Sequence, residues 1–262
     1  MIDVTQANPN LLNIYGYVED PKRYYIVTEQ RKVDERVEIQ EAIMSRGKFS
    51  EKDAANLACQ LLGAMSFAHA NDLVHTNLKP ENILLARHAD WSELRIINFP
   101  ISVGFDNNKS LNEKWQAPHF LAPELFDSKK EPNAKSDGWS CGAIIYLLLS
   151  GKPPFGGATD AEVIDNVKAG NFDLTGDVWD NVSESAKELI RGLLTVDVNS
   201  RMSVEDASEH DWILNSFQIR EKENTDGENE ALRNLKRFNS DQKLLRAVMA
   251  FIAKEVFFLD EE

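Results

Sequence analysis

The stretch His75-Thr-Asn-Leu-Lys-Pro-Glu-Asn82 lies between two different local patterns, a helical one before it and strands after it. Over residues 50–68, small and apolar residues recur at helical spacing, which predicts a helix with one buried face. The apolar runs Ile83-Leu-Leu85 and Leu94-Arg-Ile-Ile97 have the length of short strands. We therefore predict that this polar stretch joins a long buried helix to two short strands.

Outward from this stretch, the upstream residues indicate a hairpin and the downstream residues indicate helices. Ile14–Val18 and Tyr24–Thr28 are strand-like runs joined by the turn-forming Glu19-Asp-Pro-Lys22, which predicts an antiparallel hairpin. From residue 137 onward the periodicity is helical, and Gly151 is placed to end the first of these helices. The predicted helices span residues 137–150, 161–169, 183–195 and 203–210. The predicted fold class is α+β.

The composition and charge of the sequence indicate which kinds of partner and which cellular compartment to expect. The chain has 262 residues, 42% of them hydrophobic, and its formal charge of -14 argues against nucleic acid or an anionic membrane as a partner. Cys59 and Cys141 lie in apolar helical stretches without CxxC spacing, so we expect buried thiols in a reducing compartment. No apolar, cleavable leader opens the sequence, so we expect a cytoplasmic protein, with the cytoskeleton as an alternative location.

Three short motifs, in the right order, resemble those of protein kinases. Residues 75–82 look like the catalytic loop, Asn98-Phe-Pro100 lies where the family has its metal-binding Asp-Phe-Gly, and Ala122-Pro-Glu124 matches the Ala-Pro-Glu motif. Ser136–Gly142 resembles the helix that anchors the large lobe. The resemblance runs from about Asn8 to Ile213. It implies a protein-kinase-like fold with a mostly helical C-lobe, a remnant β-hairpin of the N-lobe and a C-terminal junction helix.

Two segments are similar to calcium-dependent protein kinases, namely Arg46–Ala55 and the tail from Ala231 to Ala253. In that family the tail is an autoinhibitory junction that precedes four calcium-binding EF-hands, whereas this sequence contains no Asp-x-Asp-x-Asp-Gly loop. The resemblance implies an N-lobe remnant over residues 1–30, a C-lobe over 31–213, a charged linker over 214–230 and an amphipathic tail over 231–262.

The catalytic positions depart from the family pattern. The resemblance places the catalytic aspartate at Asn77, and an amide cannot take the proton of a substrate hydroxyl at neutral pH. The metal-binding aspartate is Asn98, so the expected metal ligands are the amides of Asn82 and Asn98, although Mg²⁺ favours carboxylates. The following glycine is Pro100, which restricts the hinge of the activation segment. We therefore expect no intact catalytic site and weak metal binding.

Nucleotide binding and activation-loop phosphorylation are also not expected. Upstream of the hairpin there is no Gly-rich loop or Val-Ala-Ile-Lys strand, and residues 30–40 replace the family's Gly-Glu-Leu hinge region. The arginine that pairs with an activation-loop phosphate is Thr76, and the threonine before the substrate-binding turn is Ala117. Lys79 and Asn82 match active kinases, but we interpret them as loop-stabilising polar residues. No cofactor is expected in place of the family's ATP and Mg²⁺.

Residues that support the fold are retained. The resemblance implies a buried ion pair between Glu124 and Arg201, and it implies that Asp137 accepts backbone N–H bonds from the catalytic loop. We interpret His75 as a packed structural histidine of that loop. The skeleton of the domain is therefore expected to persist although its catalytic groups are replaced.

The tail over residues 231–262 has an apolar stripe at helical spacing with basic residues outside it. Such a helix can be bound by an EF-hand or calmodulin-like protein, or it can pack on its own kinase lobe or on a stable partner. Both alternatives stay open. The expected partner-binding residues are Leu232, Leu235, Phe238, Leu244, Val248, Phe251 and Ile252.

Three functions compete. The favoured hypothesis is a catalytically inactive scaffold or interaction protein, held with protein partners in a larger assembly, and it rests on the replacements at Asn77 and Asn98. The first alternative is an active serine/threonine calcium-dependent protein kinase, or a fragment of one, that transfers the γ-phosphate of ATP to protein. The second alternative is a calcium-responsive module whose tail helix recruits an EF-hand protein.

Overall fold

The computed structural model describes residues 2–20, 23–29, 36–86, 93–99, 118–127 and 129–215. The chain divides into two units, Met1–Leu214 and Asn215–Glu262. The predicted tail helix and nearly all of the predicted charged linker fall in the second unit, outside the described residues. The elements of the first unit are α1 (Ile2–Gln6), β1 (Ile14–Glu19), β2 (Tyr24–Thr28), β3 (Arg36–Glu38), α2 (Ile39–Arg46), α3 (Glu51–Ala70), η2 (Pro80–Asn82), β4 (Ile83–Ala86), β5 (Leu94–Ile96), η4 (Pro118–Phe120), η5 (Pro123–Phe126), α4 (Ala134–Ser150), α5 (Asp160–Ala169), α6 (Glu184–Leu193) and α7 (Val204–Ser208).

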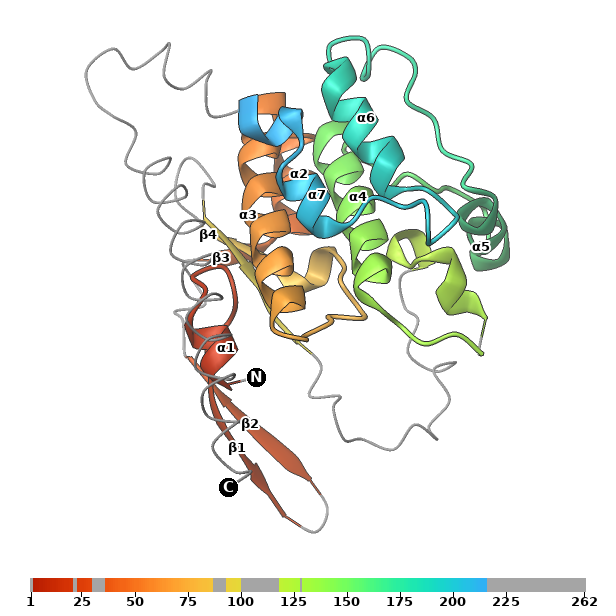
Figure 1. Ribbon diagram of the computed structural model, residues 1–262. Helices are drawn as coiled ribbons and strands as arrows, with labels where there is room; N and C mark the ends of the chain where they lie inside the picture. The colour runs from red at the N-terminus through yellow and green to blue at the C-terminus, as the bar shows by residue number, and fades with distance from the viewer. Residues whose placement is uncertain are drawn as a thin grey trace, which may run out of the picture. The chain divides into compact units, whose positions relative to one another are not determined.

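Helix α4 forms the centre of the helical part, because every residue from Ser136 to Leu149 is buried. The side chain of Asn133 caps the first turn by accepting the backbone N–H groups of Lys135 and Ser136. Gly151 ends the helix in the left-handed conformation, with a φ of 75°. A helix that is apolar on all sides needs neighbours on all sides, and α3, α6 and α7 pack against it (Figure 1).

Two small features set the packing around α4. Gly142 permits a close approach of α4 and α6, because a Cβ added there would lie 2.7 Å from the Cβ of Leu193. Helix α3 begins after Ser50, whose side chain accepts the backbone N–H of Asp53. Its apolar face is buried along the whole length of the helix, as the periodicity predicts.

The strands of the described residues form two separate small sheets. Strands β1 and β2 make an antiparallel hairpin, with Tyr17 opposite Ile26, that extends away from the helices (Figure 1). Strands β3, β4 and β5 form a second antiparallel sheet in that order. A bridge between Leu11 and Ile96 joins the segment before the hairpin to β5. The fold is therefore mixed helix and sheet with few strands, in agreement with the predicted class.

The predicted hairpin, the two predicted short strands and the predicted helices are present, with differences at their ends. Helix α4 begins three residues before the predicted start at residue 137, because the Asn133 cap precedes it. Helix α6 ends at Leu193 rather than at residue 195, and α7 is shorter at both ends than predicted. Strand β3 and helix α2 were not predicted, since β3 is only three residues long and is defined by its pairing with β4.

Candidate functional site

The loop of residues 75–82 is held to helix α4 by one carboxylate. Asp137 is 1% exposed and accepts the backbone N–H of His75 at 2.7 Å and that of Thr76 at 2.8 Å. Its Oδ2 also lies 2.9 Å from Nε2 of His69, in the last turn of α3. Because Asp137 sits in the first turn of α4, the beginning of the loop is fixed relative to both helices.

His75 is fully buried and connects the loop to the segment after β5. Its Nε2 lies 3.0 Å from the carbonyl oxygen of Ile97, and its ring packs on Phe99 with the ring centroids 4.7 Å apart. Burial lowers the pKa of His75 below its ordinary value, although the nearby charge of Asp137 opposes part of this effect. The imidazole is therefore neutral near pH 7 and donates its Nε2 proton to Ile97.

The two asparagine side chains that the resemblance gives as metal ligands lie in contact. Nδ2 of Asn98 donates to Oδ1 of Asn82 at 2.9 Å, and Nδ2 of Asn82 donates to the carbonyl oxygen of Asn77 at 2.8 Å. Asn98 has a φ of 60°, a left-handed conformation that asparagine adopts more readily than most residues. Asn82 is only 4% exposed, so its side chain depends on these partners. We call the Asn82–Asn98 contact the amide pair.

The amide pair does not suit Mg²⁺. This ion needs octahedral oxygen ligands and normally takes one or two carboxylates from a protein. Both side chains of the pair are neutral, and Oδ1 of Asn82 already accepts a hydrogen bond from Asn98. Within the part of the chain that the structure describes, no group of three His, Cys, Asp or Glu side chains is placed to hold a metal ion. The donor set at this position therefore does not fit the ion.

The other predicted loop positions lie beside the amide pair. Asn77 is half-buried, and its backbone N–H donates to the carbonyl oxygen of His75 at 2.8 Å. Lys79 is half-buried and contributes its carbonyl oxygen, which accepts the backbone N–H of Asn82 at 2.9 Å. Thr76 has a φ of 65°, which is uncommon for a β-branched residue. The structure thus joins Asn77, Asn82 and Asn98 in one hydrogen-bonded chain.

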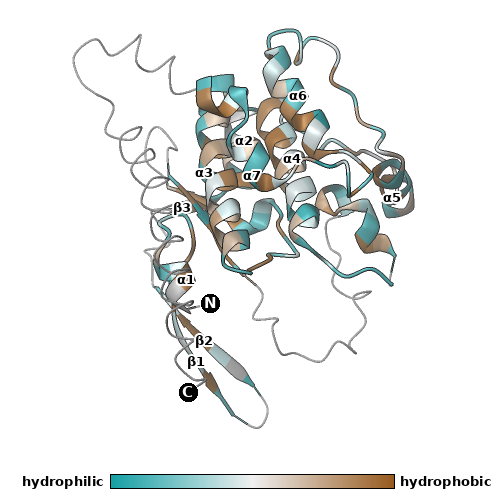
Figure 2. Cartoon of the chain, viewed as in Figure 1, coloured by the Kyte–Doolittle hydropathy of each residue, from teal (hydrophilic) through white to brown (hydrophobic). Residues whose placement is uncertain are grey.

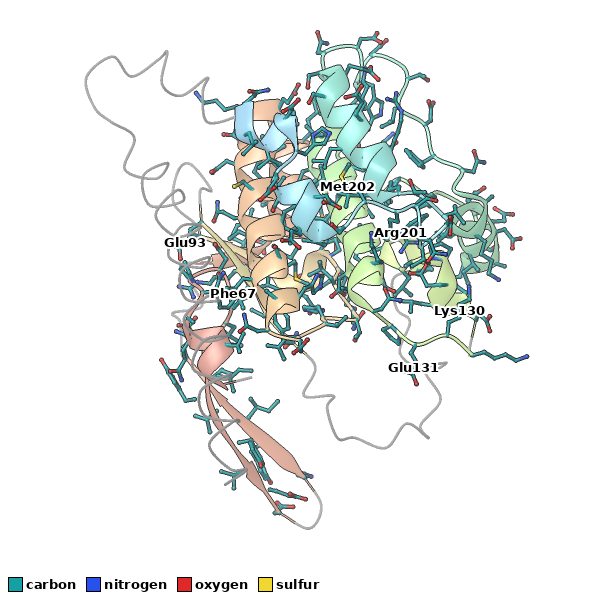
Figure 3. All side chains as sticks on the ribbon, viewed as in Figure 1. Phe67, Glu93, Lys130, Glu131, Arg201 and Met202 are labelled. Atoms are coloured by element: carbon teal, nitrogen blue, oxygen red, sulfur yellow. The ribbon has the colours of Figure 1, made fainter. Side chains whose placement is uncertain are left out.

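Glu124 and Arg201 form a buried two-bond ion pair. Nη1 of Arg201 donates to Oε1 of Glu124 at 2.7 Å, and Nη2 donates to Oε2 at 2.9 Å. The remaining N–H donors of the guanidinium reach the carbonyl oxygens of Lys135, Thr195 and Val196. All five donors of Arg201 therefore have an acceptor, which satisfies the condition for burying this charge. Figure 3 shows Arg201 beside α4.

The carboxylate of Glu124 is also fully engaged. Oγ of Ser136 donates to Oε1 of Glu124 at 2.8 Å. Burial alone would raise the pKa of Glu124, but the hydrogen bonds and charge of Arg201 outweigh it and lower the pKa below its ordinary value. Glu124 is therefore ionised at neutral pH. Breaking such a pair by removing one partner costs about 3–5 kcal/mol, because the other charge stays buried.

Sequence reasoning missed two polar residues that anchor the first residues of the chain. Oε1 of Gln60 accepts the side-chain amide of Asn10 at 3.0 Å and the backbone N–H of Leu94 at 2.9 Å. Arg95 is 9% exposed, and its Nη1 donates to the carbonyl oxygen of Leu11 at 3.0 Å. The sequence contains one signal for these contacts, the charged Arg95 inside the apolar run of β5. The contacts themselves could not be predicted, because the partners lie 34 to 84 residues apart in sequence.

Several predicted positions fall outside the described residues. These are Pro100, Ala117 and all of the partner-binding residues of the tail, and residues 30–35 of the replaced hinge segment also belong to this group. Among the described residues, no helix combines the length and apolar character needed to cross a bilayer.

Comparisons of the sequence with known proteins match it to protein kinases. The model of the protein kinase domain matches residues 1–213. Calcium-dependent protein kinase 4 of Plasmodium falciparum (isolate 3D7) is 33% identical over 257 residues, which cover 96% of this chain and 47% of the relative. Calcium-dependent protein kinase 25 of Arabidopsis thaliana is 34% identical over 250 residues, or 95% of this chain and 46% of the relative.

A third relative is the calcium/calmodulin-dependent protein kinase type II alpha chain of Drosophila melanogaster, 32% identical over 247 residues, or 92% of this chain and 44% of the relative. The chain thus spans about half the length of the curated relatives it matches. The loop held by Asp137 and the ion pair of Glu124 with Arg201 lie within the matched residues. On the match over residues 1–213, the chain belongs to the protein kinase domain family.

Proposed function

We propose that this protein is a catalytically inactive member of the family that works as a scaffold or interaction protein in a larger assembly. The observation that supports this most strongly is the amide pair, in which Asn98 donates a hydrogen bond to Asn82 at 2.9 Å. If both asparagine side chains held one metal ion, each would direct an oxygen at the ion and neither would donate a hydrogen bond to the other. Here Asn98 donates and Asn82 accepts, so the two side chains bond to each other and need no metal ion as a partner.

The substrate side of the loop supports the same proposal. Asn77 occupies the position of the general base, and loss of general-base help typically costs about 10²–10⁴ in rate. That loss alone leaves measurable catalysis. It is combined here with the absence of a carboxylate from the amide pair, which removes the charge that would hold a metal ion against phosphate oxygens.

The retained groups support a role for the body of the domain. Asp137 still holds the loop, and Arg201 still satisfies all five of its donors. The contacts of Asp137 with the loop and of Arg201 with Glu124 and Lys135 join segments more than 60 residues apart in sequence, and none of them involves a nucleotide. A protein that keeps them presents a stable helical surface to protein partners. A cytoplasmic or cytoskeletal location remains part of this proposal.

Thermal denaturation with Mg²⁺ alone, ATP alone and both together tests the proposal. A ligand at about one hundred times its dissociation constant would add about 2.7 kcal/mol, which is about 5–10 °C in a domain of this size. We expect no metal-dependent shift and no transfer of labelled phosphate to a peptide substrate. A shift that requires both Mg²⁺ and ATP, accompanied by phosphate transfer, would instead establish an active enzyme.

The second candidate is an active serine/threonine protein kinase. It is supported by the printed names of the relatives, which are calcium-dependent or calcium/calmodulin-dependent protein kinases at 32–34% identity. It is also supported by the presence of Lys79 and Asn82 in the loop. The phosphate-transfer assay above separates it from the favoured proposal.

The third candidate is a calcium-responsive module that recruits an EF-hand protein through residues 231–262. Its support is the basic amphipathic pattern of the tail together with the calmodulin in the name of the Drosophila relative. Calorimetric titration of the whole chain with calmodulin and Ca²⁺ tests it, with Leu235 and Phe251 replaced by aspartate in one variant. The matched control is Met44→Asp, a 79% exposed position on α2. Binding that ignores calcium or the tail substitutions would eliminate this candidate.

A further inference from the structure

One carboxylate joins three segments of the first unit. Glu51, in the first turn of α3, accepts the indole N–H of Trp212 through Oε1 at 2.8 Å and the backbone N–H of Ser183 through Oε2 at 3.0 Å. Oγ of Ser183 also donates to Oε1 of Glu51. Ser183 lies 132 residues from Glu51 in sequence, and Trp212 lies 161 residues from it. We call this set of contacts the Glu51 joint.

The joint holds the beginning of α6 and the last residues of the first unit. Ser183 is the N-cap of α6, and its Oγ accepts the backbone N–H of Ala186 at 3.2 Å. Figure 2 shows hydrophilic and hydrophobic residues on α6, whose apolar face is buried. Trp212 is 5% exposed, and its segment lies beside the beginning of α3 (Figure 1). The second unit begins at Asn215, three residues after Trp212.

The three residues of the joint differ in accessibility. Ser183 is exposed, whereas Glu51 is half-buried and Trp212 is buried. The hydroxyl of Ser183 is therefore the part of the joint that an enzyme can reach. Asp180 and Glu184 flank it with negative charge, so an enzyme that binds this stretch needs a basic substrate site.

We propose that Ser183 is a phosphorylation site and that its phosphate opens the Glu51 joint. A separate protein kinase with a basic substrate site transfers the γ-phosphoryl group of ATP to Oγ of Ser183. The new P–O bond forms as the bond to the β-phosphate oxygen breaks, ADP leaves, and the hydroxyl proton passes to solvent. This inference goes beyond the proposed function, and it holds whether or not this chain is itself catalytic.

Charge determines the direction of the change. Phosphoserine carries about −1.5 to −2 charges at pH 7 and has lost its O–H donor, so it repels the Glu51 carboxylate to which the hydroxyl donated. The same phosphate is favoured at the first turn of α6, where backbone N–H groups and the positive end of the helix dipole lie. Lys187 adds a positive charge one turn along this helix. The phosphate therefore stays with α6, and Glu51 moves away from it.

The displaced carboxylate changes the environment of Trp212. Its indole N–H is buried and loses the acceptor at 2.8 Å. A buried donor without an acceptor destabilises the state that contains it, so the segment of residues 210–214 opens more often. Phosphorylation of Ser183 would thus set how firmly the residues directly before the second unit are held.

Hydrogen exchange of the full chain, measured by mass spectrometry, tests the opening. Ser183→Asp keeps a good N-cap on α6 but sets a carboxylate against Glu51, whereas the matched Ser183→Asn keeps the cap and offers an N–H donor instead. The backbone N–H groups of residues 212–214 all donate to His210. We expect them to exchange about tenfold faster in Ser183→Asp and at the wild-type rate in Ser183→Asn. Exchange in α4 should not change in either variant.

Two further variants separate the joint from a general loss of folding. Glu51→Gln, added to Ser183→Asp, supplies an amide that donates to the new carboxylate and accepts the N–H of Trp212, so the slow exchange of residues 212–214 should return. Thr159→Asp is the control for the added charge. Thr159 is an exposed N-cap on α5 that accepts the backbone N–H of Glu162, and this substitution should leave residues 212–214 unaffected.

The modification itself is tested by phosphopeptide mapping of the protein isolated from its own cells, and by exchange measurements on full chain synthesised with phosphoserine at position 183. We expect phosphate on Ser183, and we expect the phosphorylated chain to exchange as Ser183→Asp does until a phosphatase restores the wild-type rate. A Ser183 that stays free of phosphate would overturn the proposal. So would exchange of residues 212–214 that ignores the phosphate, or that rises equally in Ser183→Asp and Ser183→Asn.

Discussion

Asn98→Asp restores the residue type that active kinases use at this position, and we expect it to destabilise the protein when no metal is present. In the wild type, Nδ2 of Asn98 donates to Oδ1 of Asn82 at 2.9 Å. An aspartate replaces that donor with an acceptor, so two oxygens would face each other. Asn82 cannot rotate its amide to compensate, because its own Nδ2 is bonded to the carbonyl oxygen of Asn77 at 2.8 Å.

The size of the effect follows from burial. Asn98 is exposed, so its new carboxylate keeps its hydration, and the cost falls on Asn82, which is 4% exposed. Leaving a buried acceptor unsatisfied costs about 1–3 kcal/mol. In a unit of 214 residues this lowers the melting temperature by about 2–12 °C, at about 2–4 °C per kcal/mol.

Thermal denaturation in EDTA and in millimolar Mg²⁺ provides the assay. The Asn98→Asp variant offers one carboxylate and one amide oxygen, so Mg²⁺ should recover part of the lost stability, whereas the wild type should not respond. Asn98→Ala is the matched control, since it loses the same hydrogen bond without adding a carboxylate and should be insensitive to metal. If Asn98→Asp melts at or above the wild-type temperature in EDTA, the amide pair does not have the role we assign to it.

The remaining predictions concern the buried ion pair, the replaced catalytic positions and the buried histidine. Arg201→Met should lower the free energy of unfolding by about 3–5 kcal/mol in chemical denaturation, because it leaves the Glu124 carboxylate buried and unpaired. A double variant that adds Glu124→Gln should recover part of this loss. If the effects of the two substitutions were fully additive, the two side chains would not be energetically coupled. Restoring aspartate at both Asn77 and Asn98 should yield no phosphate transfer, because residues 30–40 replace the family's hinge region and nucleotide binding is not expected. A rescued enzyme would contradict that expectation about nucleotide binding. The lowered pKa of His75 means that the unfolded state binds its proton first, so stability should fall as the pH drops below about 6.5, by at most about 1.4 kcal/mol per pH unit. His75→Gln should flatten that dependence between about pH 5.5 and 7, and an unchanged slope would assign it to another group.

Local signals were sufficient for the larger elements. The hairpin was visible from two apolar runs around a turn, and helix α3 from its periodicity and the Ser50 cap. Strand β3 was not visible, because three residues carry no period and their state depends on pairing with β4. Helix α2, which follows it directly, was missed as well.

The candidate site divides in the same way. The resemblance to protein kinases pointed to Asn77, Asn82 and Asn98. The direction of the hydrogen bond between the last two, however, depends on the left-handed backbone of Asn98 and on a contact across 16 residues. His69 gave no warning of its contact with Asp137, which lies 68 residues away. The sequence identified the side chains that differ from the family, whereas the hydrogen bonds between them are visible only in the structure.

The fully engaged guanidinium of Arg201 has one more consequence. It joins the segment of Glu124 to the first turn of α4 and to the turn after α6, and it leaves no N–H donor free for a phosphate or a small molecule. None of these contacts involves a nucleotide. The proposed scaffold role therefore predicts that a protein partner docked on these helices binds equally well with and without ATP.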